Sequence, residues 1–345
     1  MHLRAWGLVL VLLAPACGTS SRDLAIERAP DAVTTSSTVE PTTTSVPSPP
    51  ESLAAPAAPV PSTSTSSSSP SVESVPVAPG TVEPYRGLGA WLDRYDWSVE
   101  WAGPNGSPVG VEAIDHMAAE GVQTLYIQTS YWEDDVGVIE PERLGAILSR
   151  ARDHGIAVVG WYLPAFVDPA KDLEHIMAMA ALGIEGVAID IEGTQVDDVE
   201  ERSRRLVALS AELRRRLPGQ AIGGIVLEPV LIEDLSATYW PDFPWTEIEP
   251  YYDVWMPMAY WTNRVGEWRS AYRYTATNIA RVRSNLGDED AMVHPIGGVG
   301  TDSTAQDLEE MLQASAEHGA IGGSIYDYAT SRPEFWDVLR GFRNG

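Results

Sequence analysis

The carboxy-terminal part of the chain repeats one pattern of hydrophobic and polar positions. A stretch of helical character ends at a glycine, and a short apolar run follows, as in "RARDHGIAVVGWY" and "SAEHGAIGGSIYD". Glycine suits the left-handed conformation just past a helix, and apolar runs of this length are typical of buried strands. Helices alternating with such strands predict a parallel sheet. The junction glycines are Gly121, Gly155, Gly183 and Gly319.

Eight apolar runs are the expected strands of that sheet. With the helices between them they occupy residues 83–345, and about 260 residues is the usual size of a (β/α)8 TIM barrel. A doubly wound sheet is the alternative, although no glycine-rich phosphate-binding fingerprint follows the first run. The expected strands cover residues 88–93, 123–130, 157–163, 186–192, 221–228, 253–261, 292–297 and 322–328.

The fourth run, "GVAIDIEG", carries two acids, Asp190 and Glu192, at the end of an otherwise apolar strand. Side chains alternate along a strand, so both acids share one face. The other face carries Val187, Ile189 and Ile191. In a barrel of this kind, catalytic residues lie at the carboxyl ends of the strands. We therefore expect both acids to point into the mouth of the barrel.

The same alternation predicts which other side chains face the interior. Four carboxylates would meet at the mouth: Asp93, Asp190, Glu192 and Glu228. Their mutual repulsion raises their pKa values, which keeps an acid protonated for catalysis, and Glu192 is the candidate general acid. A hydrogen-bonded network closing the barrel is the structural alternative. The other residues expected to face inward are Gly89, Trp91, Tyr126, Gln128, Gly224, Val226, Met256, Met258, Tyr260, Ser324, Tyr326 and Tyr328.

The aromatic composition favours a sugar ligand. The chain has 12 Trp against 4 Phe, and indole rings suit the apolar faces of pyranoses. Nine tryptophans lie in or after expected strands, and about half of these are expected to be exposed in a groove; they are Trp91, Trp97, Trp101, Trp132, Trp161, Trp240, Trp245, Trp255 and Trp261. Residues 229–250 form the candidate specificity loop. The predicted substrate-binding residues are Trp91, Tyr126, Gln128, Trp161, Glu228, Met258, Trp261 and Tyr326.

The amino terminus has the organisation of an export signal. Arg4 precedes an apolar core at residues 5–13, which is too short to remain as a membrane span. Cys17 is the only cysteine, which excludes an intrachain disulfide and a thiolate metal cluster. It follows Leu-Ala-Pro-Ala, which resembles a bacterial lipobox. We expect lipidation of Cys17 and anchoring to the outer face of the cell membrane, with ordinary secretion as the alternative.

Residues 18–82 are dominated by Ser, Thr, Pro, Ala and Val. Such a segment buries too little apolar surface to offset its ordering entropy, so a disordered linker is expected. As a flexible coil it spans on the order of 45 Å, enough to tether a domain above a membrane. A glycosylated stalk is the alternative. The expected organisation is a signal peptide at 1–17, the linker at 18–82 and the barrel at 83–345.

The net charge of −26 argues against nucleic acid as a partner and is compatible with neutral or cationic glycans. The histidines are scattered and no acidic cluster has ligand spacing, so neither a metal nor a cofactor is expected.

At this level of detail the motifs resemble a known family. "EGVAIDIEG" is similar to the fourth-strand signature of family 18 glycoside hydrolases, the chitinase-like barrels. The resemblance implies that Glu192 is the acid, that Asp190 assists it, and that Tyr260 of "DVWMPMAYW" holds the reacting group of the substrate. "GGSIYDYAT" resembles the eighth strand, with Tyr326 where that family usually has Trp. The Asp-x-Glu also resembles family 25 lysozymes, in which an acid on the first strand contributes, as Asp93 would here.

Several positions depart from the family 18 pattern. Glu185 and Ala188 replace two earlier acids, and Trp261 replaces an Asp, which argues against acetamido-assisted cleavage of the chitin type. The seventh strand offers His294 instead of a carboxylate nucleophile. The remaining mechanisms are protonation by Glu192 with either substrate assistance or a water activated by Asp93 or Glu228.

Three functions therefore stay open. The chain is expected to be a glycoside hydrolase acting on a cell-envelope or environmental polysaccharide. The altered acid series favours, as a second reading, a barrel that binds glycan without cleaving it. The third is a hydrolase or lyase of another bond that uses the same mouth.

Overall fold

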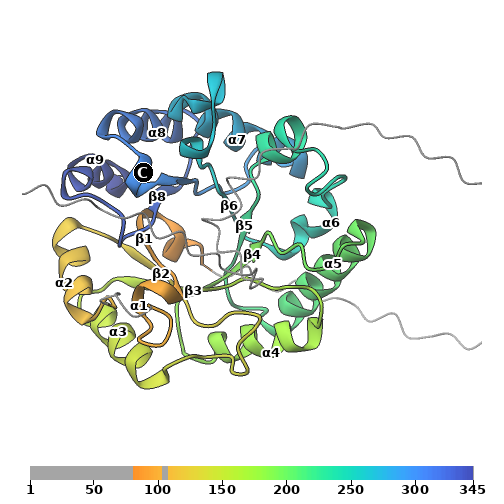
Figure 1. The fold of residues 1–345 in the computed structure, drawn as a ribbon, viewed down its shortest axis with the longest axis horizontal. Coiled ribbons are helices and arrows are strands. Elements are labelled where there is room, and N and C mark those ends of the chain that lie inside the picture. The colour runs from red at the N-terminus through yellow and green to blue at the C-terminus, as the bar shows by residue number, and fades with distance from the viewer. Residues whose placement is uncertain (1–80, 103–107, 345) are drawn as a thin grey trace, which may run out of the picture. The chain divides into compact units, whose positions relative to one another are not determined.

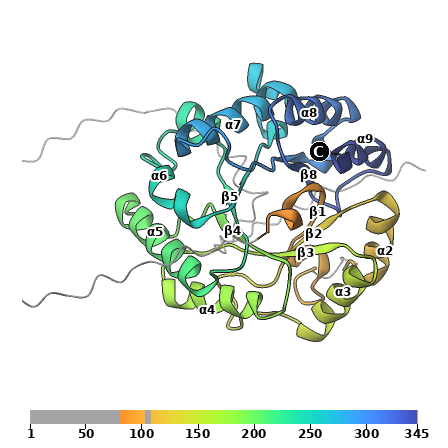
Figure 2. The same ribbon diagram turned by 180° about the vertical axis from the view of Figure 1, so that it is seen from behind.

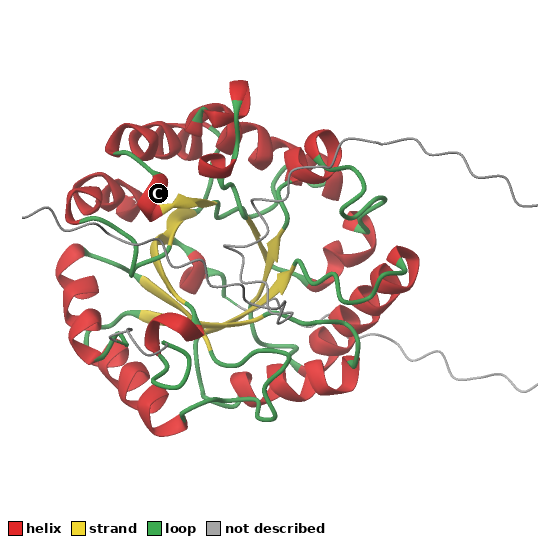
Figure 3. Cartoon of the chain, in the orientation of Figure 1, coloured by secondary structure: helices red, strands yellow, loops and turns green. Residues whose placement is uncertain are grey.

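The computed structural model describes residues 81–102 and 108–344. The expected signal peptide, Cys17 and nearly all of the expected linker lie outside the described residues. Within them, strands form a central ring and helices surround it (Figures 1 and 3). The strands are β1 (Gly87–Leu92), β2 (Thr124–Gln128), β3 (Ala157–Tyr162), β4 (Gly186–Ile191), β5 (Ile222–Val226), β6 (Val254–Pro257), β7 (Ile296–Val299) and β8 (Gly322–Tyr326).

All strand pairs are parallel, in the order β6-β5-β4-β3-β2-β1-β8-β7. Isolated bridges from Trp255 to Val293 and from Met258 to Ile296 link β6 to β7, so the ring closes. This confirms the predicted (β/α)8 architecture. The seventh strand lies later than expected, because Pro295 interrupts the run and the regular pairing of β7 starts at Ile296.

Helices follow the strands around the outside of the ring, as the view from behind also shows (Figure 2). The α-helices are α1 (Arg94–Trp97), α2 (Val111–Glu120), α3 (Pro141–Asp153), α4 (Pro169–Ala180), α5 (Val199–Arg216), α6 (Trp245–Ile248), α7 (Ala271–Leu286), α8 (Ala305–Glu317) and α9 (Trp336–Leu339). Short helical turns are η1 (Glu83–Tyr85), η2 (Leu231–Leu235), η3 (Glu249–Tyr251), η4 (Trp261–Asn263), η5 (Gly266–Arg269), η6 (Gly300–Asp302), η7 (Pro333–Phe335) and η8 (Arg340–Asn344). None of the helices in the described part has the length and apolar character to cross a bilayer.

The junction glycines have the conformation that the sequence predicts. The φ angles of Gly121, Gly155, Gly183 and Gly319 are 82°, 69°, 67° and 60°. Each lies in the left-handed region that side-chain-bearing residues rarely adopt, and each redirects the chain from the end of its helix into the next strand.

The lower end of the barrel is filled by Tyr85, which precedes β1. Its hydroxyl donates to the carbonyl oxygens of Val187 (2.7 Å) and Ala221 (3.1 Å) at the starts of β4 and β5. Gly186 and Gly223 leave room for the ring, because a Cβ on either would lie within 3 Å of it. The upper end is thereby left as the place for chemistry.

The inward orientation predicted for Gly224, Val226 and Glu228 is wrong. Gly223 pairs with Ala188, and a Cβ on Gly223 would face Ala188, whereas one on Gly224 would meet Trp255 outside the barrel. Val226 therefore faces outward by alternation. The second and third residues of this strand, Gly223 and Gly224, carry no side chain to reveal its faces, which is why the pattern was ambiguous.

The inward orientation predicted for Tyr328 is also wrong. Its hydroxyl is 3.3 Å from His116 Nδ1 of α2, and its ring contacts Trp336 of α9. Tyr328 lies beyond the end of β8, where strand alternation no longer applies. The other inward assignments on β1, β2, β6 and β8 that contacts test agree with the structure, including Gly89 against Tyr126 and Ser324.

Candidate functional site

Asp190 and Glu192 lie at the carboxyl end of β4. Asp190 is on the same face of the strand as Ala188, whose Cβ faces the interior. Both acids are 95% buried, with 5% of each exposed. Within the described residues, Asp190 Oδ1 and Glu192 Oε1 have no hydrogen-bond partner. The structure thus places Asp190 on the interior face of β4, as the alternation predicts, and leaves one oxygen of each buried acid unsatisfied.

The pKa values of both acids are displaced upward. Burial raises the pKa of Asp190 well above its usual range, and the negative charge of Glu192 adds to this. Burial and then the charge of Glu228 raise the pKa of Glu192 to about 7. Glu192 is therefore disposed to hold a proton near neutral pH, which is the property a general acid needs.

Tyr260 shares the environment of these acids. Burial raises the pKa of its hydroxyl, and the charges of Glu192 and Asp190 are the next largest causes. Its ring centroid lies 6.0 Å from that of Tyr326. Tyr239, which the sequence did not single out, donates its hydroxyl to the carbonyl oxygen of Glu192 at 3.4 Å. It comes from the loop at 229–250 predicted to determine specificity.

An aromatic floor lies below the acids. Trp91 stacks on Tyr126 at 4.3 Å and meets Trp161 edge-on at 6.0 Å. Within the described residues, the Tyr126 hydroxyl and Trp161 Nε1 lack hydrogen-bond partners. The three rings are buried against one another and leave two polar atoms unused.

The position of Trp91 is set by two polar residues beneath it. Its Nε1 donates to Ser324 Oγ at 2.8 Å. His294 Nδ1 lies 2.8 Å from the carbonyl oxygen of Tyr85 and must carry the proton, so Nε2 accepts from the Ser324 hydroxyl at 3.0 Å. Burial lowers the pKa of His294 to about 4, which keeps the ring neutral. Sequence reasoning placed Ser324 inward but did not connect it with His294.

Asp93 and Gln128 hold the first loop in place. Asp93 caps α1 by accepting from the amides of Tyr95 (2.8 Å) and Asp96 (3.1 Å), and it also accepts from the Tyr326 hydroxyl at 2.8 Å. Gln128 Oε1 accepts from the amide of Arg94 at 3.0 Å. Asp93 is thus held by three hydrogen bonds within the first loop and to β8, which favours a positioning role over water activation.

Glu228 turns toward α7. Its Oε1 accepts from Arg264 Nη2 at 2.5 Å and from the Tyr274 hydroxyl at 3.0 Å. Arg264 Nε also donates to the Tyr274 hydroxyl at 2.7 Å. Arg264 and Tyr274 were not predicted from the sequence, because nothing in the local pattern links them with the fifth strand. Glu228 acts on the site through its charge near Glu192.

The expectation that about half of nine tryptophans are exposed is wrong. Seven of them are buried, and Trp101 and Trp132 are half-buried. Trp240 donates to Ser203 Oγ of α5, and Trp255 packs against Tyr252 outside the barrel. Trp261 lies against Gly297 and Gly298 of β7, where a Cβ would come within 3 Å of its ring, so we do not include it in the site. The pattern along a strand does not show that helices and loops cover the large rings at the strand ends, so it could not predict their burial. The buried tryptophans are Trp91, Trp97, Trp161, Trp240, Trp245, Trp255 and Trp261.

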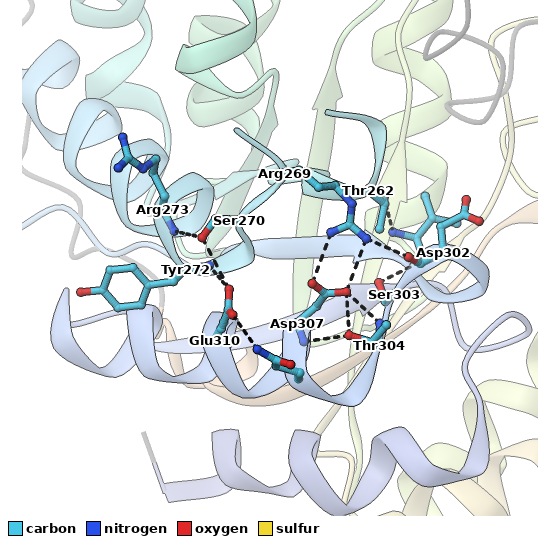
Figure 4. Close-up of polar contacts among 12 residues, drawn as sticks. Thr262, Arg269, Ser270, Tyr272, Arg273, Asp302, Ser303, Thr304, Asp307 and Glu310 are labelled. Atoms are coloured by element: carbon cyan, nitrogen blue, oxygen red, sulfur yellow. Dashed lines mark hydrogen bonds and ion pairs between the residues drawn. The ribbon is translucent and has the colours of Figure 1, made fainter. Parts of the chain in front are cut away.

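The loops after β6 and β7 are tied to one another beside the mouth (Figure 4). Thr262 Oγ1 accepts from the amide of Val299 at 3.1 Å, and Arg269 donates to Asp307 Oδ1 at 3.2 Å. Thr304 and Asp307 form a capping box that starts α8. Because Thr262 follows Tyr260 by two residues, these contacts hold the loop that presents the Tyr260 hydroxyl.

One acidic group outside the pair has the spacing of metal ligands. Asp93, Asp96 and Asp327 each offer an oxygen within 4.8 Å of the others. Asp93 and Asp96 also form a capping box at the start of α1, in which the side chain of each accepts a hydrogen bond from the backbone amide of the other.

Met258, predicted to bind substrate, is buried at the end of β6 and forms one of the bridges that close the barrel.

Solved structures with a similar fold include chitinases and a spore cortex-lytic enzyme. A class V chitinase mutant from Cycas revoluta in complex with (GlcNAc)3 aligns with TM-score 0.55 and 11% identity, covering 75% of this chain and 100% of that one. The spore cortex-lytic enzyme SleL from Bacillus megaterium gives 0.53 and 9%, covering 74% and 73%. Active domain 2 of the chitinase from Pyrococcus furiosus gives 0.53 and 13%, covering 76% and 98%.

These likenesses confirm the resemblance to the family 18 barrels at the level of the fold. At such identities they carry no residue roles to this chain. No protein-family model matches the sequence. No curated protein sequence matches it either.

Proposed function

We propose that this protein is an exported glycoside hydrolase that cleaves O-glycosidic bonds in a cell-envelope or environmental polysaccharide. The observation that carries the proposal is the buried pair of Asp190 and Glu192, with unsatisfied oxygens and raised pKa values, above a floor of aromatic rings. The fold shared with chitinases and a cortex-lytic enzyme supports the same reading.

In this proposal Glu192 donates its proton to the glycosidic oxygen as the bond breaks. Asp190 stabilises the positive charge that develops at the anomeric carbon, and Tyr260 holds the attacking group on the other side. Trp91 and Trp161 form the buried floor beneath the sugar. Asp93 and Glu228 are committed to α1 and α7, so we assign them positioning and electrostatic roles.

The test is turnover of a panel of polysaccharides, with new reducing ends as the readout. Glu192→Gln is expected to lower the rate by at least about 100-fold, because it removes the transferable proton and keeps the shape. Glu309→Gln, on the exposed face of α8, is the matched control and should retain the wild-type rate. Cleavage that survives Glu192→Gln would refute the assignment of the acid.

A non-catalytic glycan-binding barrel is the second candidate, and one observation favours it. The acid series is interrupted at Ala188. Glu185, just before β4, lies away from the site, and its Oε2 accepts from the amide of Val158 in β3 at 2.9 Å. Binding of a glycan without any shortening of it would support this candidate.

We also propose where the protein is located. The lipobox-like segment before Cys17 supports lipid anchoring to the outer face of the cell membrane, with residues 18–82 as a tether.

A further inference from the structure

Asp190 and Glu192 lack the hydrogen-bond donors that Asp172, another buried carboxyl of this barrel, has. Asp172 accepts from the Tyr162 hydroxyl at 2.9 Å and from the amide of Phe166 at 3.0 Å. Asp190 Oδ1 and Glu192 Oε1 accept no hydrogen bond from the described residues, and neither acid forms an ion pair with them. A buried carboxylate without a donor or cation is costly, so this arrangement suits a donor that arrives with a ligand.

Arg264 does not supply the missing positive charge. Its guanidinium is bound to Glu228 at 2.5 Å and to the Tyr274 hydroxyl at 2.7 Å, on the side of α7. Glu228 thereby consumes the charge of this arginine, while its own negative charge still acts on Glu192. The pair at the end of β4 therefore has no cationic partner among the described residues.

The rings beside the acids also suit a cation. Tyr260 is close enough to Glu192 and Asp190 for their charges to raise the pKa of its hydroxyl, and its ring centroid lies 6.0 Å from that of Tyr326. Ring faces attract ammonium groups, most strongly where water is excluded. Carboxyls and aromatic rings together therefore favour an ammonium group over a neutral hydroxyl.

We propose that the sugar bound against Asp190 and Glu192 carries a free amino group, so that the substrate is a glycan containing de-N-acetylated hexosamine. This inference rests on the proposed function for its site and narrows the substrate class. An ammonium group brings a charge and three donors. An acetamide brings one N–H and no charge, and a hexose brings only hydroxyls.

The chemistry of hydrolysis is consistent with such a ligand. The ammonium group favours the ionised form of Asp190, which stabilises the positive charge that develops at the anomeric carbon. Glu192 gives its proton to the leaving oxygen as that bond breaks, and the oxygen of a water held by Tyr260 bonds to the anomeric carbon. The step consumes one water, and the proton that this water loses returns to Glu192 and restores the site.

The experiment is calorimetric titration of the full chain with three tetrasaccharides at about pH 6, where amino sugars are protonated. The probes are the tetramers of glucosamine, of N-acetylglucosamine and of glucose. We expect the glucosamine tetramer to bind at least about tenfold more tightly than the other two. Asp190→Asn should abolish this preference, and Asp302→Asn, an exposed acid on the loop after β7, should retain it.

The outcomes separate this inference from the proposed function. Equal or tighter binding of the acetylated tetramer, or a preference that persists in Asp190→Asn, overturns the inference. If Asp190→Asn does not fold, as judged by circular dichroism, Glu192→Gln replaces it and should weaken the preference. Mass spectrometry of the probes reports cleavage separately. Preferential binding without cleavage supports the inference and refutes hydrolysis, whereas cleavage restricted to the acetylated tetramer leaves hydrolysis standing and overturns the inference.

Discussion

At the scale of single residues, the protonation state of Glu192 governs the proposed reaction. Burial and the charge of Glu228 raise its pKa to about 7, and only the protonated form donates. Activity is therefore expected to fall as the pH rises through about 7. With an unperturbed glutamate as the acid, activity would already fall at acidic pH, because such a group ionises there. The measurement is the rate of glycan cleavage as a function of pH. A falling limb near the pKa of a free glutamate would contradict the assignment.

Asp190 links the site to stability. Its pKa in the folded protein lies above the value in the unfolded chain, so its contribution to stability is present at low pH and is lost as the pH rises. Asp190→Asn is therefore expected to increase the free energy of unfolding by about 1 kcal/mol at pH 8 and by less at pH 5. Urea unfolding at both pH values measures this. An equal effect at the two pH values would argue against titration as the cause.

At the scale of elements, the bond between Glu228 and Arg264 joins the end of β5 to the loop before α7. Glu228 is almost completely buried, so removing its partner leaves a buried unpaired charge. Arg264→Met is expected to lower the free energy of unfolding by about 3 kcal/mol or more. In the double variant with Glu228→Gln part of the loss should be recovered, and a double-mutant cycle in urea measures the coupling. Additive losses would contradict a direct interaction.

Elements were predictable from sequence where the hydrophobic pattern had only one physical solution. Four glycines with positive φ end helices where the sequence expected them. The orientation of β4 follows from its alternation, because a strand with apolar residues on one face and acids on the other can be placed in only one way. For β5 two consecutive glycines removed that information, and only pairing with β4 decided which face carries Val226.

At the scale of the whole molecule, the proposed location depends on Cys17. If its side chain is lipidated, Cys17→Ser should move the protein from the membrane fraction to the soluble fraction, because the acyl chains provide the hydrophobic anchor. Fractionation followed by immunodetection measures this, and Ser20→Ala, just past the predicted cleavage point, is the control. A Cys17→Ser variant that stays with the membrane would indicate another mode of attachment.

The sequence by itself determined the features that depend on local periodicity and composition. It determined the alternating helices and strands, the barrel, and the common face of Asp190 and Glu192, because strand alternation is a local geometric rule. It did not determine the partners of those acids. Only the tertiary structure decided that Glu228 turns to Arg264, that Asp93 caps α1, and that most tryptophans are packed inside. Hydrogen-bond partners and burial arise between segments far apart in the chain, and no local pattern encodes their distances.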